Sequence, residues 1–256
     1  MTSAIRLSSV GKTFTSKKSV VEALQDVALE VAPGEFISIV GTSGCGKSTL
    51  LRIVAGLIRP TSGEVRVNDR PVDGPHDDIG IVFQTPVLLP WRSVWRNVSL
   101  QLELRGIDGP QHHGEIARLL ELTGLRSFEA AYPYQLSGGM QQRVALCRAL
   151  VHNPKLLLMD EPFGALDALT RESMNSELQR VWLQTNKTVL FITHSITEAV
   201  FLSDRIAVMS ARPGRVKEIV EVRIPRPRGR DIIKDPEFFT AVDRIRTLMD
   251  AAGTTD

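Results

Sequence analysis

The chain has 256 residues, of which 43% are hydrophobic and 23% are charged, and its formal net charge is +2 at pH 7. This composition is that of a globular protein with a sizeable core, and it excludes disordered, collagen-like and disulfide-stapled chains. Because positive and negative charges are nearly balanced, the composition does not indicate a nucleic-acid-binding protein. Two cysteines, Cys45 and Cys147, indicate a reducing compartment. No apolar run approaches the roughly 18 residues of a membrane span, so we expect any membrane role to be peripheral.

In the N-terminal part, apolar and polar residues alternate in short runs. These runs, at 5–14, 21–31 and 64–68, are separated by turn residues and predict an antiparallel flank. Other runs are apolar throughout, which is typical of strands buried on both faces in a mostly parallel sheet. They lie at 36–40, 79–83, 156–159, 189–193 and 206–209.

Stretches with helical spacing lie between the apolar runs. They cover 47–57, 137–152, 166–183 and 195–202. This alternation of strands and helices predicts a doubly wound α/β core. Between about 86 and 136 there is no strong strand pattern. Helical patterns at 94–104 and 115–125, broken by two glycines and Pro110, predict a helical insertion there.

The part after Arg212 is rich in proline and arginine. We expect its arginines, at 223, 226, 228 and 230, to lie in a solvated loop, followed by a last helix over 236–252. The sequence thus predicts one domain over 1–256. Its expected parts are a core of about 1–87 and 150–220, a helical insertion of about 88–149, and a C-terminal tail and helix of about 221–256.

Residues 41–48 read Gly-Thr-Ser-Gly-Cys-Gly-Lys-Ser and match the pattern G-x-x-x-x-G-K-[ST] between a predicted strand and a predicted helix. The glycines let the backbone curl, so that N–H groups and the helix N-terminus converge on a phosphate. Lys47 would reach the β- and γ-phosphate oxygens, and the Ser48 hydroxyl would bind Mg²⁺. A glycine-rich turn before an ordinary helix is the alternative, and the complete strand, loop and helix context disfavours it.

The apolar run 156–159 ends in two carboxylates, Asp160 and Glu161, at the strand end where α/β sheets bind ligands. Asp160 suits a Mg²⁺ role, and Glu161 suits a general base that polarises a water. Acidic residues often simply end strands, but the nearby phosphate loop favours the functional interpretation. The histidines at 76, 112, 113 and 152 have no metal-ligand spacing and are expected at the surface.

A second anion site is predicted at residues 136–140, which read Leu-Ser-Gly-Gly-Met. Ser137 can cap the following helix, and Gly138 and Gly139 leave its first N–H groups uncovered. Alone, this pattern is usually a turn and a cap. Its position 23 residues before Asp160 makes it specific.

With these motifs the chain resembles the nucleotide-binding subunit of ATP-binding cassette (ABC) transporters, from Phe14 to about Met209. The helix after 136–140 distinguishes that family from other phosphate-loop proteins. The resemblance implies an α/β fold, a P-loop NTPase core with a mostly parallel sheet, an antiparallel β flank and an inserted helical subdomain. Two positions depart from the commonest pattern: Met140 replaces a Gln, and Phe14 replaces a Tyr that stacks on adenine.

The resemblance also implies roles for individual residues. Gln84 would reach Mg²⁺ and the attacking water, His194 would hydrogen-bond the γ-phosphate, and 165–167 would form the D-loop. Out of context, Gln84 could be a surface amide, His194 a strand-end histidine and Phe14 a core residue. The implied catalytic residues are Glu161, His194 and Gln84, and the implied metal ligands are Ser48, Gln84 and Asp160. The implied ATP-binding residues are Phe14, Gly41, Thr42, Ser43, Gly44, Cys45, Gly46, Lys47, Ser48, Thr49, Ser137, Gly138 and Gly139.

As a member of this family, the chain would hydrolyse ATP with Mg²⁺ and form a head-to-tail homodimer. Each ATP would lie between the phosphate loop of one chain and Ser137 to Gly139 of the other. The implied partners are integral membrane permease subunits and, indirectly, an extracytoplasmic solute-binding protein, at the cytoplasmic face of the inner membrane. Segments 82–91 and 210–216 are similar to the ATPases of nitrate, sulfonate and taurine importers, so import of such a small solute is expected.

Two other function classes remain open. One is a cassette ATPase that acts on nucleic acid or ribosomes, although the chain has neither a long coiled-coil insertion nor a second cassette. The other is a small-molecule kinase on the same loop, which would leave 136–140 and His194 without a role. The sequence names neither the transported solute nor the permease, because solute specificity belongs to other chains.

Overall fold

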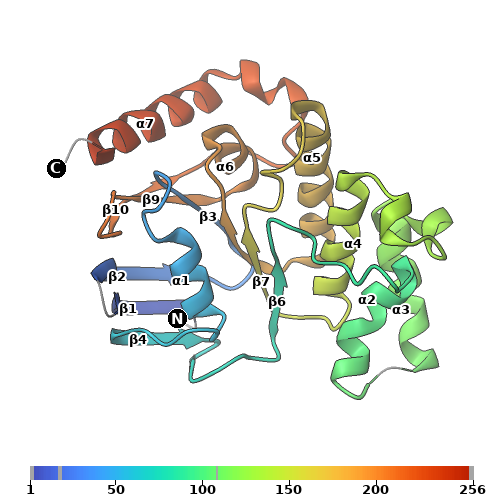
Figure 1. The fold of residues 1–256 in the computed structure, drawn as a ribbon. Helices are drawn as coiled ribbons and strands as arrows, with labels where there is room; N and C mark the ends of the chain where they lie inside the picture. Colours follow the sequence, from blue (N-terminus) through green and yellow to red (C-terminus); the bar gives the residue numbers. More distant parts are fainter. Residues whose placement is uncertain (1–2, 17–18, 108, 254–256) are drawn as a thin grey trace.

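The computed structural model describes residues 3–16, 19–107 and 109–253. Within them, a six-stranded sheet has the strand order β10-β9-β3-β8-β7-β6 (Figure 1). Its strands are β3 (Phe36–Val40), β6 (Ile79–Val82), β7 (Leu156–Asp160), β8 (Thr188–Ile192), β9 (Arg205–Met209) and β10 (Val216–Glu221). All neighbours pair in parallel except β10, an edge strand antiparallel to β9 that the sequence analysis missed. The expected mostly parallel sheet is confirmed.

A second, antiparallel sheet has the order β2-β1-β4-β5. Its strands are β1 (Ile5–Thr15), β2 (Val20–Val31), β4 (Ser62–Val67) and β5 (Arg70–Pro71). Alternation along β1 buries Ile5 and Leu7 and turns Arg6 outward, as expected for a sheet with one solvated face. The predicted antiparallel flank is confirmed.

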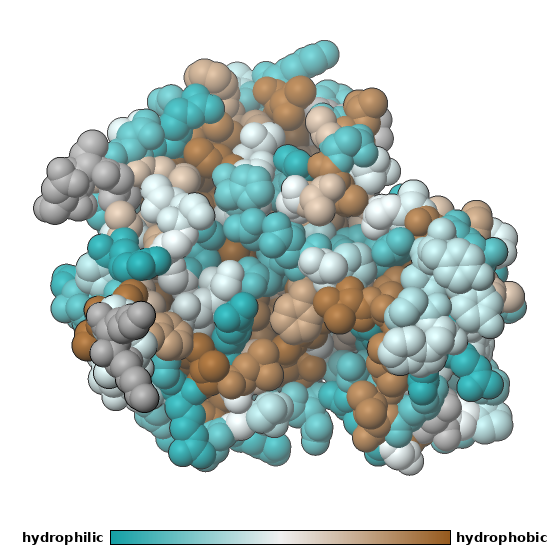
Figure 2. Space-filling model, in the orientation of Figure 1, coloured by the Kyte–Doolittle hydropathy of each residue, from teal (hydrophilic) through white to brown (hydrophobic). Residues whose placement is uncertain are grey.

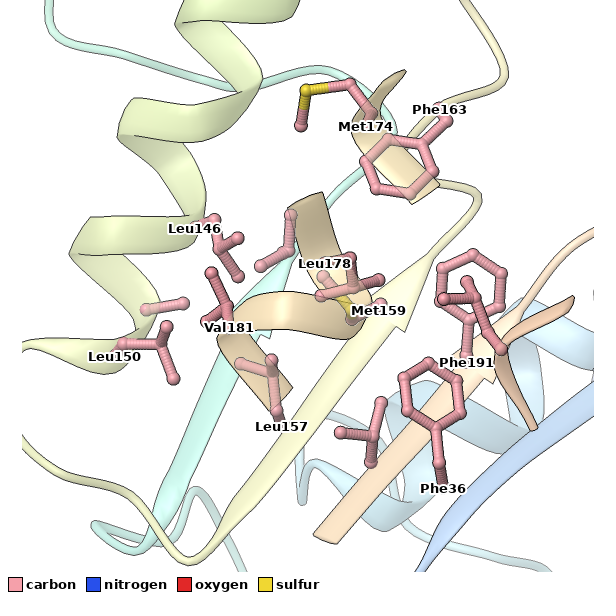
Figure 3. Packing of buried hydrophobic residues seen from close by; sticks show 14 of the residues in the cluster. Phe36, Leu146, Leu150, Leu157, Met159, Phe163, Met174, Leu178, Val181 and Phe191 are labelled. Carbon is pink, nitrogen blue, oxygen red and sulfur yellow. The ribbon is translucent and has the colours of Figure 1, made fainter. Parts of the chain in front are cut away.

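Helices cover the main sheet on both faces, because each buried strand is apolar on both sides. Ile37 and Ile39 of β3 pack with α1 and the antiparallel sheet, whereas Phe36 and Val40 pack in the cluster that includes α4 and α5. Figure 3 shows Leu146 and Leu150 of α4 facing side chains of α5 and β7 in that cluster. The helices are α1 (Lys47–Val54), α2 (Val94–Leu104), α3 (Pro110–Leu122), α4 (Gly138–Leu150), α5 (Ala168–Thr185), α6 (Ile196–Leu202) and α7 (Pro236–Gly253).

The predicted bounds of two helices are wrong. The first helix ends at Val54 rather than at 57, because the chain turns through Gly56 with a φ of +71°. The α3 helix begins at Pro110, which the sequence analysis treated as a break. Proline suits the first turn of a helix, where its missing N–H has no intrahelical partner. Between β6 and β7, the helices α2, α3 and α4 lie together on one side of the molecule (Figure 1).

The expectation of a solvated arginine loop after β10 is wrong for two residues. Arg228 is 2% exposed, and its guanidinium donates hydrogen bonds to the carbonyl oxygens of Val200, Phe201, Ser203 and Ile224. These carbonyls include ones at the C-terminal end of α6 that have no partner inside the helix. The tail is thereby fixed to the core.

Arg226 forms the second tail contact. It pairs with Asp204, and its guanidinium lies 4.4 Å from the centre of the Trp182 ring. Arg223, in contrast, keeps 86% of its side chain exposed. The side chain of Arg230 lies outside the described part. None of the helices in the described ranges has the length and apolar character needed to cross a membrane.

The Arg228→Ala variant is expected to lower the free energy of unfolding by about 3 kcal/mol, because four buried carbonyls lose their donor. The matched variant Arg223→Ala, in the exposed part of the same tail, should change it by less than about 0.5 kcal/mol. Urea denaturation of both variants measures the difference. Equal, small effects would contradict a structural role for Arg228.

Candidate active site

The loop 41–46 joins β3 to α1 and wraps around the Lys47 side chain. Gly44 and Gly46 have φ values of +78° and +102°, the left-handed region that favours glycine. A Cβ on Gly46 would also lie 2.7 Å from the carbonyl oxygen of Ala23. The Lys47 ammonium donates to the carbonyl oxygens of Gly41 at 2.8 Å and Thr42 at 3.1 Å. The local geometry is that of an anion-binding loop at a helix N-terminus.

Ser48 and Asp160 meet beside this loop. The Ser48 hydroxyl donates to Oδ1 of Asp160 at 2.9 Å. Burial raises the pKa of Asp160 and the neighbouring Glu161 carboxylate acts the same way, whereas the Ser48 hydrogen bond opposes the rise. Hydroxyl and carboxylate oxygens are ligands that Mg²⁺ prefers, usually together with substrate phosphates. This donor pair therefore fits a magnesium ion.

Glu161 and His194 come from neighbouring strands. His194 Nδ1 lies 3.2 Å from Oε2 of Glu161. Asp160 on β7 pairs with Ile192 on β8, so the two side chains follow strand ends at the same level. Glu161 has a positive φ of +46°, a strained conformation that tends to occur at functional sites.

Gln84 reaches the same place from the end of β6. Its Nε2 lies 3.1 Å from the position that a Cβ on Gly164 would take, and Oε2 of Glu161 lies 3.7 Å from that position. Gly164 thus leaves room for the predicted catalytic residues to approach one another. The sequence analysis did not identify Gly164, because no local motif marks it.

A cavity of about 310 Å³ unites most of the predicted nucleotide-binding residues. Phe14 is 44% exposed, so the core alternative for it is wrong. Lys12 Nζ lies 5.1 Å from the centre of its ring. The cavity is lined by Phe14, Val21, Ala23, Ser43, Gly44, Gly46, Lys47, Ser48, Thr49, Glu161 and Arg212.

The Cys45 side chain does not line the cavity. It is 1% exposed and packs in the core with α1, and burial raises the pKa of its thiol. Its place in the predicted site is therefore that of a backbone contributor.

Arg212 was missed as a site residue. Its guanidinium donates to the carbonyl oxygen of Gly44 at 3.1 Å and lines the same cavity. The turn between β9 and β10 packs against the loop so closely that a Cβ on Gly214 would lie 2.0 Å from the Cys45 carbonyl. The sequence analysis used 210–216 only as a likeness to importers, although the Pro-Gly pair in it marks a tight turn.

Ser137, Gly138 and Gly139 do not line the cavity of their own chain. Ser137 caps α4 by accepting a hydrogen bond from the Met140 N–H, as predicted, and both Ser137 and Gly138 are exposed. A single chain does not bring this predicted anion site to its own phosphate loop.

A groove of about 470 Å³ runs between β6 and the helices α2 and α4. Figure 2 shows hydrophobic atoms gathered in the middle of this face, between the part with β1, β2 and β4 and the part with α2, α3 and α4. Phe83 and Val87 line the groove and are 38% and 59% exposed. Arg105 and Arg148 place positive charge along the groove, which Asp77 also lines. His152 was expected at the surface, and it is half-buried at the edge of this groove.

Comparison with known protein families decides the family. The family model described as "ABC transporter" matches residues 24–164. An uncharacterized ABC transporter ATP-binding protein of Methanocaldococcus jannaschii is 49% identical over 91% of this chain and 88% of its own. This chain belongs to the ABC transporter family.

Other relatives of this ABC protein are named after import systems. The nitrate import ATP-binding protein of Synechocystis is 42% identical over 96% of this chain and 94% of its own. The taurine import ATP-binding protein of Jannaschia is 46% identical over 90% of this chain and 87% of its own. Among solved structures, a dimeric post-hydrolysis ATP-binding cassette bound to ADP and Pi is similar with a TM-score of 0.74 and 36% identity, over 86% of this chain and 100% of that one.

These findings confirm the resemblance and the predicted fold class of this ABC protein. The matched range contains the phosphate loop, Gln84, the Ser137 motif, Asp160 and Glu161. Phe14 and His194 lie outside it. The roles of the individual residues stay predictions.

The stability of this ABC protein should fall in mild acid because of His152. Burial, together with the charge of Arg105, lowers the pKa of His152 to about 4. The folded-state pKa of His152 lies below the ordinary histidine value, so the unfolded chain binds a proton more readily than the folded one. The folded state therefore has its full stability at a pH above the ordinary value and loses stability as the pH falls towards 4. We expect His152→Gln to reduce the loss of unfolding free energy between pH 7 and pH 5 by about 2 kcal/mol. Urea denaturation at both pH values measures it, and His113→Gln, at an exposed position, should leave the loss unchanged.

Proposed function

We propose that this chain is the ATP-hydrolysing subunit of an ABC importer, coupled to transport of nitrate, a sulfonate, taurine or a related small solute. The observation that supports it most is the cavity that joins the phosphate loop to Glu161 and Arg212, next to the Ser48 and Asp160 pair. Relatives named for nitrate and taurine import favour transport over action on nucleic acid. The identity of the solute rests on those names.

In the proposed reaction, the loop N–H groups and Lys47 bind the β- and γ-phosphates of ATP. Ser48, Asp160 and Gln84 would hold Mg²⁺, which neutralises charge on the phosphate oxygens when bound. Glu161 accepts a proton from the attacking water as the bond between the β- and γ-phosphates breaks, giving ADP and phosphate.

Three further residues complete the proposed site. His194, which contacts Glu161 at 3.2 Å, would hydrogen-bond the γ-phosphate and help to orient Glu161. Phe14 offers an exposed ring on which adenine can stack. Arg212, beside Gly44, adds positive charge at the cavity for the polyphosphate.

We also propose that two copies share each ATP head to tail. Ser137, Gly138 and Gly139 lie at the N-terminus of α4, away from their own cavity, and two of the three are exposed. A helix N-terminus with uncovered N–H groups binds an anion, and the γ-phosphate of an ATP held by the partner is such an anion. Hydrolysis then removes the ligand that both chains share, and the dimer opens.

The Glu161→Gln variant is expected to bind ATP, to hydrolyse it at least about 100-fold more slowly and to accumulate as a dimer, because only the proton acceptor is lost. Light scattering after size exclusion, with and without Mg-ATP, measures the dimer, and phosphate release measures hydrolysis. Glu121→Gln, at an exposed position on α3, is the matched control and should behave as wild type. A Glu161→Gln chain that stays monomeric in Mg-ATP would contradict the shared site.

For the membrane partner, we propose that a cytoplasmic helix of the permease docks in the groove at Phe83 and Val87. Exposed apolar side chains flanked by Arg105 and Arg148 suit an amphipathic helix with acidic residues. The chain would then lie at the cytoplasmic face of the membrane, and an extracytoplasmic solute-binding protein would deliver the solute. Residues of about 88–149 would form the helical subdomain that borders the groove.

Tagged wild-type protein, purified in mild detergent from its native membranes, is expected to recover a multi-span permease that mass spectrometry identifies. Val87→Asp should lose this permease yet keep ATP binding, because a charge enters the apolar part of the groove. Leu104→Asp changes an equally apolar residue, 71% exposed and outside the groove, and should keep the permease. Recovery of ribosomal or DNA-bound proteins without a permease would overturn the transport assignment.

A further inference from the structure

Glu198 binds the chain segment that contains His194, and the proposed function gives Glu198 no role. Glu198 lies in α6 and is 6% exposed. Its Oε2 accepts a hydrogen bond from the Thr193 hydroxyl at 2.5 Å, and that hydroxyl oxygen accepts one from the Ser195 N–H at 3.0 Å. Both chain neighbours of His194 are therefore connected to one buried carboxylate.

The other oxygen of Glu198 faces Arg171 on helix α5. Its Oε1 lies 3.6 Å from Nε of Arg171 on α5, and the Nη2 of the same guanidinium donates to the Leu166 carbonyl at 2.8 Å. Leu166 precedes Asp167, which caps α5 through the Thr170 N–H. A continuous series of contacts thus joins the loop before α5 to the His194 segment.

Ser195 caps α6 by accepting the Glu198 N–H, and Glu198 occupies the position of the acidic residue in a capping box. Its carboxylate does not bind the Ser195 N–H directly but binds the Thr193 hydroxyl that accepts this N–H, so the cap extends to the residue before His194. Burial raises the pKa of Glu198, and only the Thr193 hydroxyl and nearby positive charges such as Arg171 oppose that rise. Buried charge is unfavourable unless it is paired, and an apolar side chain would pack here at lower cost. What the carboxylate provides is a fixed position for the groups it binds.

We propose that Glu198 is a positioning residue for hydrolysis, which fixes the 193–195 segment so that His194 meets Glu161, and that Arg171 connects this segment to the Leu166 loop. The inference rests on the proposed ATPase function. The Leu166 loop follows Glu161 directly in the chain, and the two are also linked by a hydrogen bond from the Gly164 N–H to the Glu161 carbonyl. If a second copy displaced that loop, Glu161 would move with it because the two are neighbours in the chain. His194 would also be affected, through the contacts of Arg171 and Glu198.

Thr193 offers the sharpest test, because it is 2% exposed and two small substitutions remove its hydroxyl and its methyl group separately. Thr193→Val keeps the shape and removes the hydroxyl, and its kcat should fall roughly 10- to 100-fold as His194 loses its orientation. Its KM for ATP should stay within about twofold, because the phosphate loop is untouched. Thr193→Ser keeps the hydroxyl and should retain near-wild-type kcat. A packing role predicts the reverse order, with the serine variant slower.

A second set of variants tests the connection to the other loop. Glu198→Gln and Arg171→Gln should each lower kcat at unchanged KM, and the double variant should be no slower than the slower single one, because both interrupt the same series of contacts. Glu172→Gln, exposed on the same turn of α5, is the matched control and should keep wild-type kcat. If Thr193→Val does not fold, the kcat and KM of Glu198→Gln alone test the positioning role.

The outcomes separate the two proposals. A wild-type chain without ATP hydrolysis overturns the proposed function and this inference with it. An active wild type whose Thr193→Val and Glu198→Gln variants keep wild-type kcat overturns the inference alone. Variants that lose kcat and ATP affinity together would also overturn it, since that pattern indicates general damage to the fold.

Discussion

The candidate active site depends on the parallel register of β3, β8 and β7. Ile39 of β3 pairs with Ile192 of β8, and Asp160 of β7 pairs with the same Ile192. The carboxyl ends of the strands therefore lie at one level, and the segments that follow them emerge at one edge of the sheet. The phosphate loop, Glu161 and His194 meet only because of this register. Residues more than a hundred positions apart in the chain become neighbours at hydrogen-bond distance.

Burial strengthens the electrostatic interactions of the polar groups at this edge, but it also costs folding free energy. Lys47 is 6% exposed and is surrounded by loop carbonyls, so its charge acts in a region with little water. Asp160 and Glu198 are partly or largely buried, and burial raises the pKa of each. A core that served stability alone would replace such groups with apolar side chains. Their presence fits a site in which fixed charges and dipoles must already point at the substrate before it reacts.

The C-terminal part of the chain packs against the elements that form this edge. Strand β10 completes the sheet, and the turn before it packs on the phosphate loop and places Arg212 beside Gly44. The tail is then fixed to α6 by Arg228, and α6 begins directly after the His194 segment. A region that looks like a loose, basic tail in the sequence is thus bound to the helix that follows His194.

The sequence by itself determined the motifs and most of the elements, although not strand β10. The phosphate loop, the capping Ser137 and the buried strands depend on glycine conformations, helix caps and apolar spacing, which act over a few neighbouring residues. The start of α3 at Pro110 was missed because proline serves both to break a helix and to begin one. Only the tertiary structure decided the burial of Arg226 and Arg228, the contact of Arg212 with Gly44, and the series from Thr193 through Glu198 and Arg171 to Leu166. Each joins residues from different elements, and such contacts leave no local pattern because they form only when the sheet register brings their elements together.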